Sequence, residues 1–189
     1  SWEPMKHEAV DVVIVGAGNA AMCAALAARE GNVSVVVLER APEHLSGGNT
    51  RFTAGAMRCA YDGVDDLRKL MPDLSEEEIA RTDFGSYTEE QFFDDMARVT
   101  ENRTDPDLAE LLVKRSKATM LWMRGKGVRF APIYGRQAFK VGERFKFWGG
   151  LTVEAYGGGP GLVDAQAKAA ARDGVSVFYQ SRAVSLLQD

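Results

Sequence analysis

The hydrophobic pattern at the start of the chain predicts a strand, a helix and a second strand. Residues 11–15 form a short apolar run that ends at Gly16, which is typical of a buried parallel strand. Residues 19–29 are rich in Ala and Leu and are followed by Gly31, as expected for a helix that ends at a glycine. Residues 34–38 are again β-branched, so the unit needs a right-handed crossover.

Helix signals dominate the middle of the chain. Ser75 with Glu78, and Thr88 with Gln91, have the spacing of capping boxes. Apolar residues then recur at helical spacing over 92–99, where Phe92, Phe93, Met96 and Val99 are expected to form a core face.

A longer helix is predicted after these two. Asp105 is the expected N-cap and Pro106 the first helical residue, with the helix running to Arg124 and stopping at Gly125. Residues 128–153 alternate aromatic and basic side chains between glycines, which favours strands and loops.

The last third of the chain predicts one more helix and one more strand. Residues 157–161, Gly-Gly-Gly-Pro-Gly, are interpreted as a sharp break, followed by an Ala-rich helix over 162–173 that stops at Gly174. Residues 175–179 are then a third strand, which is expected to join the first two in one sheet.

Composition narrows the possible functions. The chain has 189 residues, 46% apolar and 26% charged, with a net charge of −4, so one domain core is possible and the excess of Lys and Arg typical of nucleic-acid binding is missing. No apolar run approaches the roughly 20 residues of a membrane helix. The two cysteines lack any zinc-site spacing, so we expect no metal and a reduced, cytoplasmic setting.

The sharpest motif is the GxGxxA run over residues 16–21. Gly16 makes the tight turn out of the strand, Gly18 lets the backbone approach a pyrophosphate, and Ala21 lets the helix pack against the strand. The diphosphate would then meet the amides near Asn19 and Ala20 at the positive end of the helix. The alternative is a glycine turn in an α/β protein that binds no nucleotide.

An acidic residue completes this fingerprint at the end of the second strand. Glu39 follows Gly18 by 21 residues, where its carboxylate can accept both ribose hydroxyls of an adenosine. An acid here argues against the extra phosphate of NADP. Arg40 either flanks the adenine or is a solvated surface charge.

A second glycine-rich loop favours FAD over NAD. Gly48 can expose its backbone N–H to phosphate, while Asn49 and Thr50 add hydrogen-bonding side chains. The small residues Ala54, Gly55 and Ala56 would let a flat ring lie against the backbone. The alternative is an ordinary flexible loop.

These motifs carry a family resemblance that covers essentially the whole chain. The run GGNTRFTAGAMR resembles the flavin loop of the fumarate reductase and succinate dehydrogenase flavoprotein superfamily. The runs over residues 84–95, 122–129 and 147–151 resemble those of FAD-dependent tricarballylate dehydrogenases. The implied fold is α/β: a Rossmann-like FAD-binding domain with a parallel sheet, a helical excursion and a small aromatic and basic β region.

The resemblance implies further cofactor contacts and a reaction. Gly158 and Gly159 would approach the flavin from another loop, and the backbone of Ala183 would meet the adenine edge. Such enzymes dehydrogenate a C–C bond next to carboxylates, here tricarballylate to cis-aconitate, by hydride transfer to flavin N5. A tricarboxylate or dicarboxylate substrate, and an electron-transfer partner, are therefore expected. The sequence assigns no catalytic base.

Arg136 and Arg144 are the candidate substrate residues, since arginine suits bidentate carboxylate binding and both lie in the aromatic and basic segment. The alternative for that segment is an amphipathic hairpin with aromatic side chains inward and cations in water. Other readings of the whole chain are a fumarate-reductase-like or ketosteroid-dehydrogenase-like enzyme, or a nucleotide-binding module without chemistry.

The same resemblance implies a larger protein. Residues 1–189 would form the N-terminal portion of the FAD-binding domain, with a capping and substrate domain and a C-terminal FAD segment lying outside it. We expect the isolated portion to be inactive.

Overall fold

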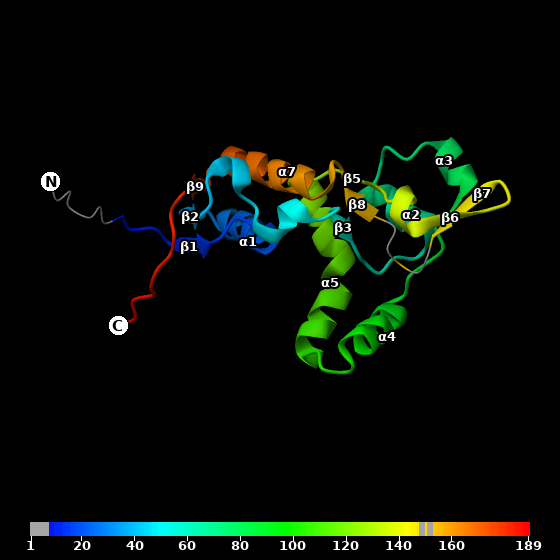
Figure 1. Ribbon diagram of the computed structural model, residues 1–189, viewed down its shortest axis with the longest axis horizontal. Helices are drawn as coiled ribbons and strands as arrows, with labels where there is room; N and C mark the ends of the chain where they lie inside the picture. Colours follow the sequence, from blue (N-terminus) through cyan, green and yellow to red (C-terminus); the bar gives the residue numbers. More distant parts are fainter. Residues whose placement is uncertain (1–7, 148–149, 151–152) are drawn as a thin grey trace. The chain divides into compact units, whose positions relative to one another are not determined.

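The computed structural model describes residues 8–147, 150 and 153–189, which divide into two compact units. The first unit comprises the chain up to Phe52 together with Val163–Asp189, and the second comprises Thr53–Leu162. Each unit is described below by itself (Figure 1). In the part of the chain described, every helix is too short or too polar to traverse a bilayer.

The first unit contains a parallel three-stranded sheet. Its strands are β1 (Val12–Val15), β2 (Val35–Leu38) and β9 (Ser176–Phe178), in the order β1-β2-β9 (Figure 1). β2 pairs in parallel with both neighbours. The prediction that the third strand joins the first two is confirmed. If β1, β2 and β9 are counted as strands 1, 2 and 3, they lie side by side in the order 3-2-1, as in one half of a dinucleotide-binding fold.

Two helices cover one face of this sheet. Helix α1 spans Asn19–Glu30, and helix α7, which crosses the boundary between the units, spans Gly158–Asp173. Both contribute to one core with the strands, whose buried members are Ala17, Met22, Ala25, Val35, Val37, Ala170 and Val175. Small side chains let these helices approach the β-branched strands closely.

The expectation that the first strand is buried is wrong for one of its faces. Val12 and Ile14 pack against the core, but Val13 and Val15 are 50% and 60% exposed. Side chains alternate between the faces of a strand, and α1 and α7 pack on the Val12 side. The continuous apolar run therefore predicts the strand correctly, but it does not predict that both faces of the strand are buried.

Helix α7 begins earlier than the sequence predicts. The glycine and proline run was interpreted as a break, yet the helix starts at Gly158 and includes Pro160. Proline is tolerated in a first helical turn, because the N–H that it lacks would have no intrahelical acceptor there. Gly157 and Gly158 have positive φ, which confines the sharp turn to those two positions.

The remaining elements of the first unit are two short 3₁₀ helices after β2. They are η1 (Glu43–Leu45) and η2 (Gly48–Phe52). The second of these contains part of the glycine-rich loop, so that loop is locally ordered by tight turns rather than irregular.

The second unit contains helices and two small sheets. One sheet has the order β3-β8-β5 with antiparallel pairing, and the other has the order β4-β7-β6, in which β7 pairs in parallel with β4 and antiparallel with β6. In chain order, the elements are β3 (Ala56–Met57), α2 (Gly63–Leu70), α3 (Glu76–Arg81), β4 (Thr82–Asp83), α4 (Glu89–Thr100), α5 (Pro106–Gly125), β5 (Phe130–Pro132), α6 (Tyr134–Gln137), β6 (Ala138–Val141), β7 (Arg144–Phe147) and β8 (Val153–Ala155).

The predicted helix starts of this unit are observed. Thr88 and Gln91 make both hydrogen bonds of a capping box before α4, whereas Ser75 Oγ accepts from the Glu78 N–H before α3. Asp105 caps α5 by accepting from two backbone N–H groups, with Pro106 as the first helical residue. These caps satisfy N–H groups that have no intrahelical acceptor.

The predicted core face of α4 is only partly correct. Phe92 is buried, but Val99 is exposed, because it lies in the last turn of the helix, which ends at Thr100. The spacing sets which side a residue faces on a helix, but tertiary packing decides how far along the helix that side is covered.

Candidate flavin site

The turn after β1 has the geometry that the glycine fingerprint requires. Gly16 adopts a φ of +96°, and its N–H donates to the Leu38 carbonyl at 2.8 Å. Helix α1 starts three residues later, with Gly18 as an N-cap that offers no side-chain cap. Among the described residues, the backbone N–H groups of Ala20 and Ala21 have no acceptor. Such amides at the positive end of a helix are suited to an anion.

The two glycine-rich loops meet within the first unit. The Asn19 N–H donates to Oγ1 of Thr50 at 3.0 Å. A Cβ added at Gly18 would lie 3.5 Å from both that hydroxyl and the Gly47 carbonyl. The Asn19 amide therefore holds the second loop, so the first-turn amides left for a phosphate are those of Ala20 and Ala21.

Glu39 lies at the end of β2 and is only 6% exposed. Its Oε2 accepts from the Ala17 N–H at 3.0 Å, and its Oε1 accepts from the Ala41 N–H at 2.9 Å. Each oxygen of an ionised carboxylate has a second lone pair. Both oxygens therefore keep one acceptor position, while the two backbone bonds fix the carboxylate beside the fingerprint turn.

A pocket of about 350 Å³ lies at this place in the first unit. Its lining includes the fingerprint turn, the acid of β2 and the segment after β9. The lining residues are Val15, Gly16, Ala17, Gly18, Leu38, Glu39, Arg40, Gly48, Ser181, Arg182 and Ala183. The structure thus brings Arg40 and Ala183 together with the fingerprint residues, whereas Asn49 is exposed and does not line the pocket.

Sequence reasoning missed two contributors to the first unit's site. The Ser181 N–H donates to the Glu39 carbonyl at 2.9 Å, which brings the segment after β9 against β2. Gln166 of α7 is 1% exposed, and its Nε2 donates to Asn19 Oδ1 at 2.7 Å. A lone glutamine in an Ala-rich helix gave no signal that pointed to Asn19.

The second unit contains the remaining expected flavin residues. Gly55 has a φ of +72°, and a Cβ there would lie 2.8 Å from the Gly158 carbonyl carbon. The Gly159 N–H donates to the Thr53 carbonyl at 3.0 Å. The segments with Ala54, Gly55 and Ala56, and with Gly158 and Gly159, therefore lie against each other. Ala56 is exposed beside this contact, in strand β3.

Taken separately, each unit contains residues whose chemistry suits part of a flavin dinucleotide. The first unit offers helix amides of Ala20 and Ala21 without a described acceptor, spare acceptor positions on Glu39, and a glycine at the N-cap position of α1. The second unit offers the small residues Ala54, Gly55 and Ala56, of which Gly55 is buried against Gly158 and Ala56 is exposed. Diphosphate, ribose and a flat ring are the three chemical groups that such features bind.

Two of the basic side chains in the aromatic and basic segment are already engaged with the protein. Arg129 pairs with Asp73 at 2.9 Å and lies over the Tyr156 ring at 4.5 Å, and Lys140 lies over the Phe145 ring at 5.5 Å. Residues 138–147 form the β6–β7 hairpin, whose cations are exposed and whose Phe147 is buried. This matches the amphipathic-hairpin alternative.

The two candidate substrate arginines lie in this segment. Arg144 is exposed on β7, in a different sheet from β3, with a 3.5 Å contact from Nη2 to the Thr82 carbonyl. The side chain of Arg136, and residues 148, 149, 151 and 152 of the third resembling run and its surroundings, lie outside the described residues. Among described residues, no group of three or more His, Cys, Asp or Glu is placed to hold a metal.

Known proteins resemble the chain over nearly its full length. It is 26% identical over 183 residues to a protein named fumarate reductase (cytochrome) from Shewanella frigidimarina. That match covers 97% of this chain and 28% of the relative, so the chain spans little more than a quarter of that protein.

Solved structures share the fold. The open conformation of a flavocytochrome c3 fumarate reductase matches with a TM-score of 0.69 and 24% identity, over 95% of this chain and 28% of that one. A 3-ketosteroid-Δ4-(5α)-dehydrogenase from Rhodococcus jostii matches with a TM-score of 0.63 and 19% identity, over 90% of this chain and 38% of that one.

The family itself is established by a match that spans almost the whole chain. Residues 11–189 match the FAD binding domain family. This stretch contains every residue that the sequence assigned to the cofactor, from Gly16 to Ala183. The chain therefore belongs to the FAD-binding domain family, and its cofactor is FAD.

Proposed function

We propose that this chain is the FAD-binding portion of an oxidoreductase that dehydrogenates a C–C bond next to carboxylates, with tricarballylate as substrate and cis-aconitate as product. The observation that carries the proposal is the meeting of the two glycine loops, where Thr50 receives the Asn19 N–H beside Gly18. One extended cofactor would use both loops together, because its diphosphate lies between the adenosine and flavin ends.

Each described feature has a task in this proposal. The amides of Ala20 and Ala21 would bind the diphosphate, and Glu39 would bind the adenosine ribose through its spare acceptor positions. The backbone of Ala54–Ala56 would support the ring. Bound FAD supplies a hydride acceptor at N5, while the protein positions the substrate carbon and excludes water.

Two findings support a carboxylate substrate. Three runs of the sequence, over residues 84–95, 122–129 and 147–151, resemble tricarballylate dehydrogenases. Independently, the Shewanella relative is named a fumarate reductase, which places a dicarboxylate in the reaction of that protein. Both substrates present carboxylates on either side of the reacting C–C bond. An electron-transfer partner that reoxidises the flavin belongs to the same proposal.

The test uses the full-length, FAD-loaded protein under anaerobic conditions. Addition of tricarballylate should bleach the long-wavelength flavin absorption band and yield cis-aconitate. A flavin band unchanged by excess tricarballylate would contradict the substrate assignment. The chain's resemblance to a fumarate reductase favours one second candidate, in which reduced protein is reoxidised by fumarate to give succinate. Reoxidation by fumarate without any reduction by tricarballylate would favour that candidate.

A further inference from the structure

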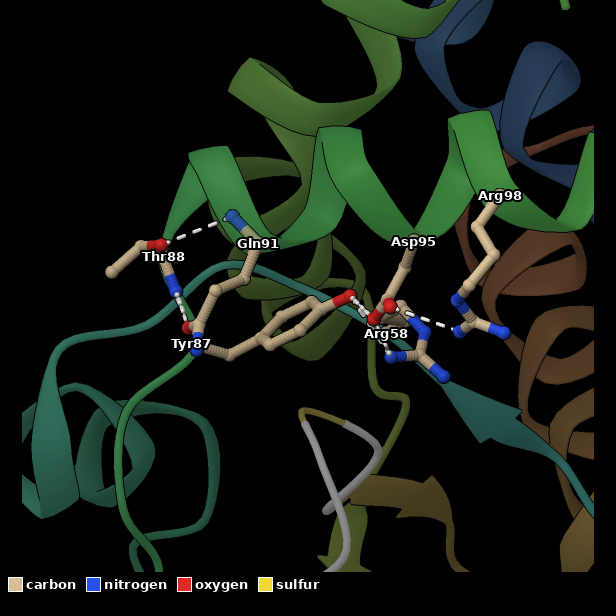
Figure 2. Close-up of polar contacts among 6 residues, drawn as sticks. All are labelled: Arg58, Tyr87, Thr88, Gln91, Asp95 and Arg98. Carbon is tan, nitrogen blue, oxygen red and sulfur yellow. Dashed lines mark hydrogen bonds and ion pairs between the residues drawn. The ribbon is translucent and has the colours of Figure 1, made fainter. Parts of the chain in front are cut away.

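A charged network in the second unit begins directly beside the expected flavin surface. Arg58 follows β3 (Ala56–Met57) by one residue. Its Nη1 donates to the Tyr87 hydroxyl at 3.1 Å and lies 3.6 Å from Asp95 Oδ2. Figure 2 shows Tyr87, Arg58 and Asp95 meeting below helix α4, with Arg98 on the other side of Asp95.

Tyr87 is held firmly in this network. It is buried, and its backbone exchanges two hydrogen bonds of 2.9 Å with Tyr61. Its ring packs 5.5 Å from the Phe92 ring, and a Cβ at Gly150 would overlap it. The hydroxyl donates to Asp95 Oδ2 at 2.5 Å. Such fixed partners hold the Arg58 guanidinium in one orientation.

The protonation states of the network leave it with net positive charge. Hydrogen bonds from Tyr87 and then Arg98 lower the pKa of Asp95, so its carboxylate is ionised near neutrality. Burial, reinforced by the hydrogen bond to Asp95, raises the pKa of Tyr87, which keeps its hydroxyl protonated. Two arginines therefore face one carboxylate, and one positive charge remains.

Arg58 still has donors to offer. Within the described part of the chain, its polar partners are all at Nη1, and its side chain is 34% exposed. An arginine has five N–H donors in a planar fork that matches a carboxylate. Arg58 comes directly after β3 and two residues after the exposed Ala56, so it lies next along the chain to the expected flavin surface.

We propose that Arg58 binds a carboxylate of the substrate, with Tyr87 and Asp95 as its positioning residues. The inference rests on the proposed function, since it assigns one carboxylate of that substrate to the side of the flavin surface carried by β3. The reason is electrostatic. A substrate with several carboxylates is attracted to a fixed, partly buried guanidinium in a network that keeps one positive charge after Asp95 is neutralised.

The test measures anion binding separately from turnover. Citrate, a tricarboxylate, is titrated into full-length FAD-loaded protein, and binding is followed by calorimetry and by perturbation of the flavin spectrum. Loss of a charge-assisted pair predicts about 10–100-fold weaker citrate binding for Arg58→Gln. Arg58→Lys should recover part of the affinity, because it keeps the charge but not the fork.

Two further variants distinguish a positioning role from a general loss of folding or of net charge. Arg103→Gln is the control, since Arg103 is 81% exposed and pairs with Glu101 outside the network, and its citrate affinity should stay near wild type. Tyr87→Phe keeps the ring packing and removes only the hydroxyl. It should weaken citrate binding and raise KM with kcat nearly unchanged, while FAD content stays normal.

Specific outcomes would overturn the inference. Citrate binding to Arg58→Gln at wild-type affinity would do so, as would an equal loss in Arg103→Gln. If Arg58→Gln does not retain FAD, phenylglyoxal labelling of wild-type protein decides: protection of Arg58 by citrate supports the inference, and equal labelling with and without citrate overturns it. If the protein oxidises tricarballylate equally well with and without Arg58, only the role of Arg58 is contradicted. If citrate binding depends on Arg58 but tricarballylate is not oxidised, only the proposed dehydrogenase activity is contradicted.

Discussion

The backbone N–H of Asn19 and the hydroxyl of Thr50 form a 3.0 Å hydrogen bond between residues 31 positions apart. This bond joins the start of α1 to the second glycine loop and consumes one of the helix amides that a phosphate could otherwise use. A helix N-terminus without a side-chain cap at Gly18 is thus capped from a distant loop.

Replacing Thr50 tests this cap. Thr50→Val keeps the shape of the side chain but removes the acceptor, so the Asn19 N–H loses its partner at a cost of about 1 kcal/mol in unfolding free energy. FAD retention should fall with it. Thr50→Ser keeps the hydroxyl and serves as the control. Urea unfolding measures the difference, and equal midpoints for the two variants would show that the hydrogen bond does not stabilise the loop.

Glu39 is expected to dominate binding of the adenosine end. In Glu39→Gln, one of the two carboxylate oxygens becomes an NH₂ that faces a backbone N–H donor, from either Ala17 or Ala41. We predict about 10–100-fold weaker FAD binding, as expected for losing hydrogen bonds to a charged group. Fluorescence titration of apoprotein with FAD measures it. Glu43→Gln, at an exposed acid in η1, is the control and should bind FAD like wild type.

Gly55 and Gly63 form a matched pair for testing the close backbone approach. Both have a φ of +72°, but a Cβ at Gly63 would meet no atom within 4 Å, whereas one at Gly55 would meet Gly158 at 2.8 Å. Gly63→Ala should cost about 1 kcal/mol for the backbone conformation alone. Gly55→Ala should cost more and reduce FAD content. Thermal unfolding in parallel decides, and indistinguishable variants would argue against a tight contact.

Asp66 should contribute to stability in a pH-dependent way. Its pKa is lowered by hydrogen bonds from the Asp62 N–H and then from Lys117, whose Nζ lies 2.9 Å from Oδ2. A carboxyl whose folded pKa is lowered stabilises the protein above its unfolded pKa, and the contribution is lost as the pH falls through the folded value.

Asp66→Asn should therefore lower stability at neutral pH and flatten its loss in acid. Urea unfolding at a series of pH values from neutral to strongly acidic measures this slope. Asp65→Asn changes an exposed neighbouring acid and is the comparison. The same acid slope in wild type and Asp66→Asn would contradict the role given to the Lys117 contact.

The sequence predicted the local elements well where the determining signals were local. The capping box of Thr88 and Gln91, the Asp105–Pro106 helix start and the three parallel strands all depend on neighbouring residues. The start of α7 was misplaced, because a Gly-Pro run can either break a helix or begin one. Only the surrounding backbone decides between the two.

The candidate site shows the same division. The glycine spacing and the acid at Glu39 were readable, because a dinucleotide fingerprint imposes fixed intervals along the chain. Gln166, Ser181 and the Arg58 network were not, since each acts through a partner far away in the sequence. Neither hydrophobic periodicity nor motif spacing indicates a hydrogen-bond partner that is distant in the sequence.

By itself, the sequence determined that this chain is an α/β dinucleotide-binding protein with two glycine loops and an acid placed for a ribose. The tertiary structure decided which amides of α1 remain free, which face of β1 is covered, and which arginine is held by fixed partners beside β3. The physical reason is that backbone conformation and hydrophobic periodicity are local properties. Hydrogen-bond partners and burial are set only when distant segments pack together.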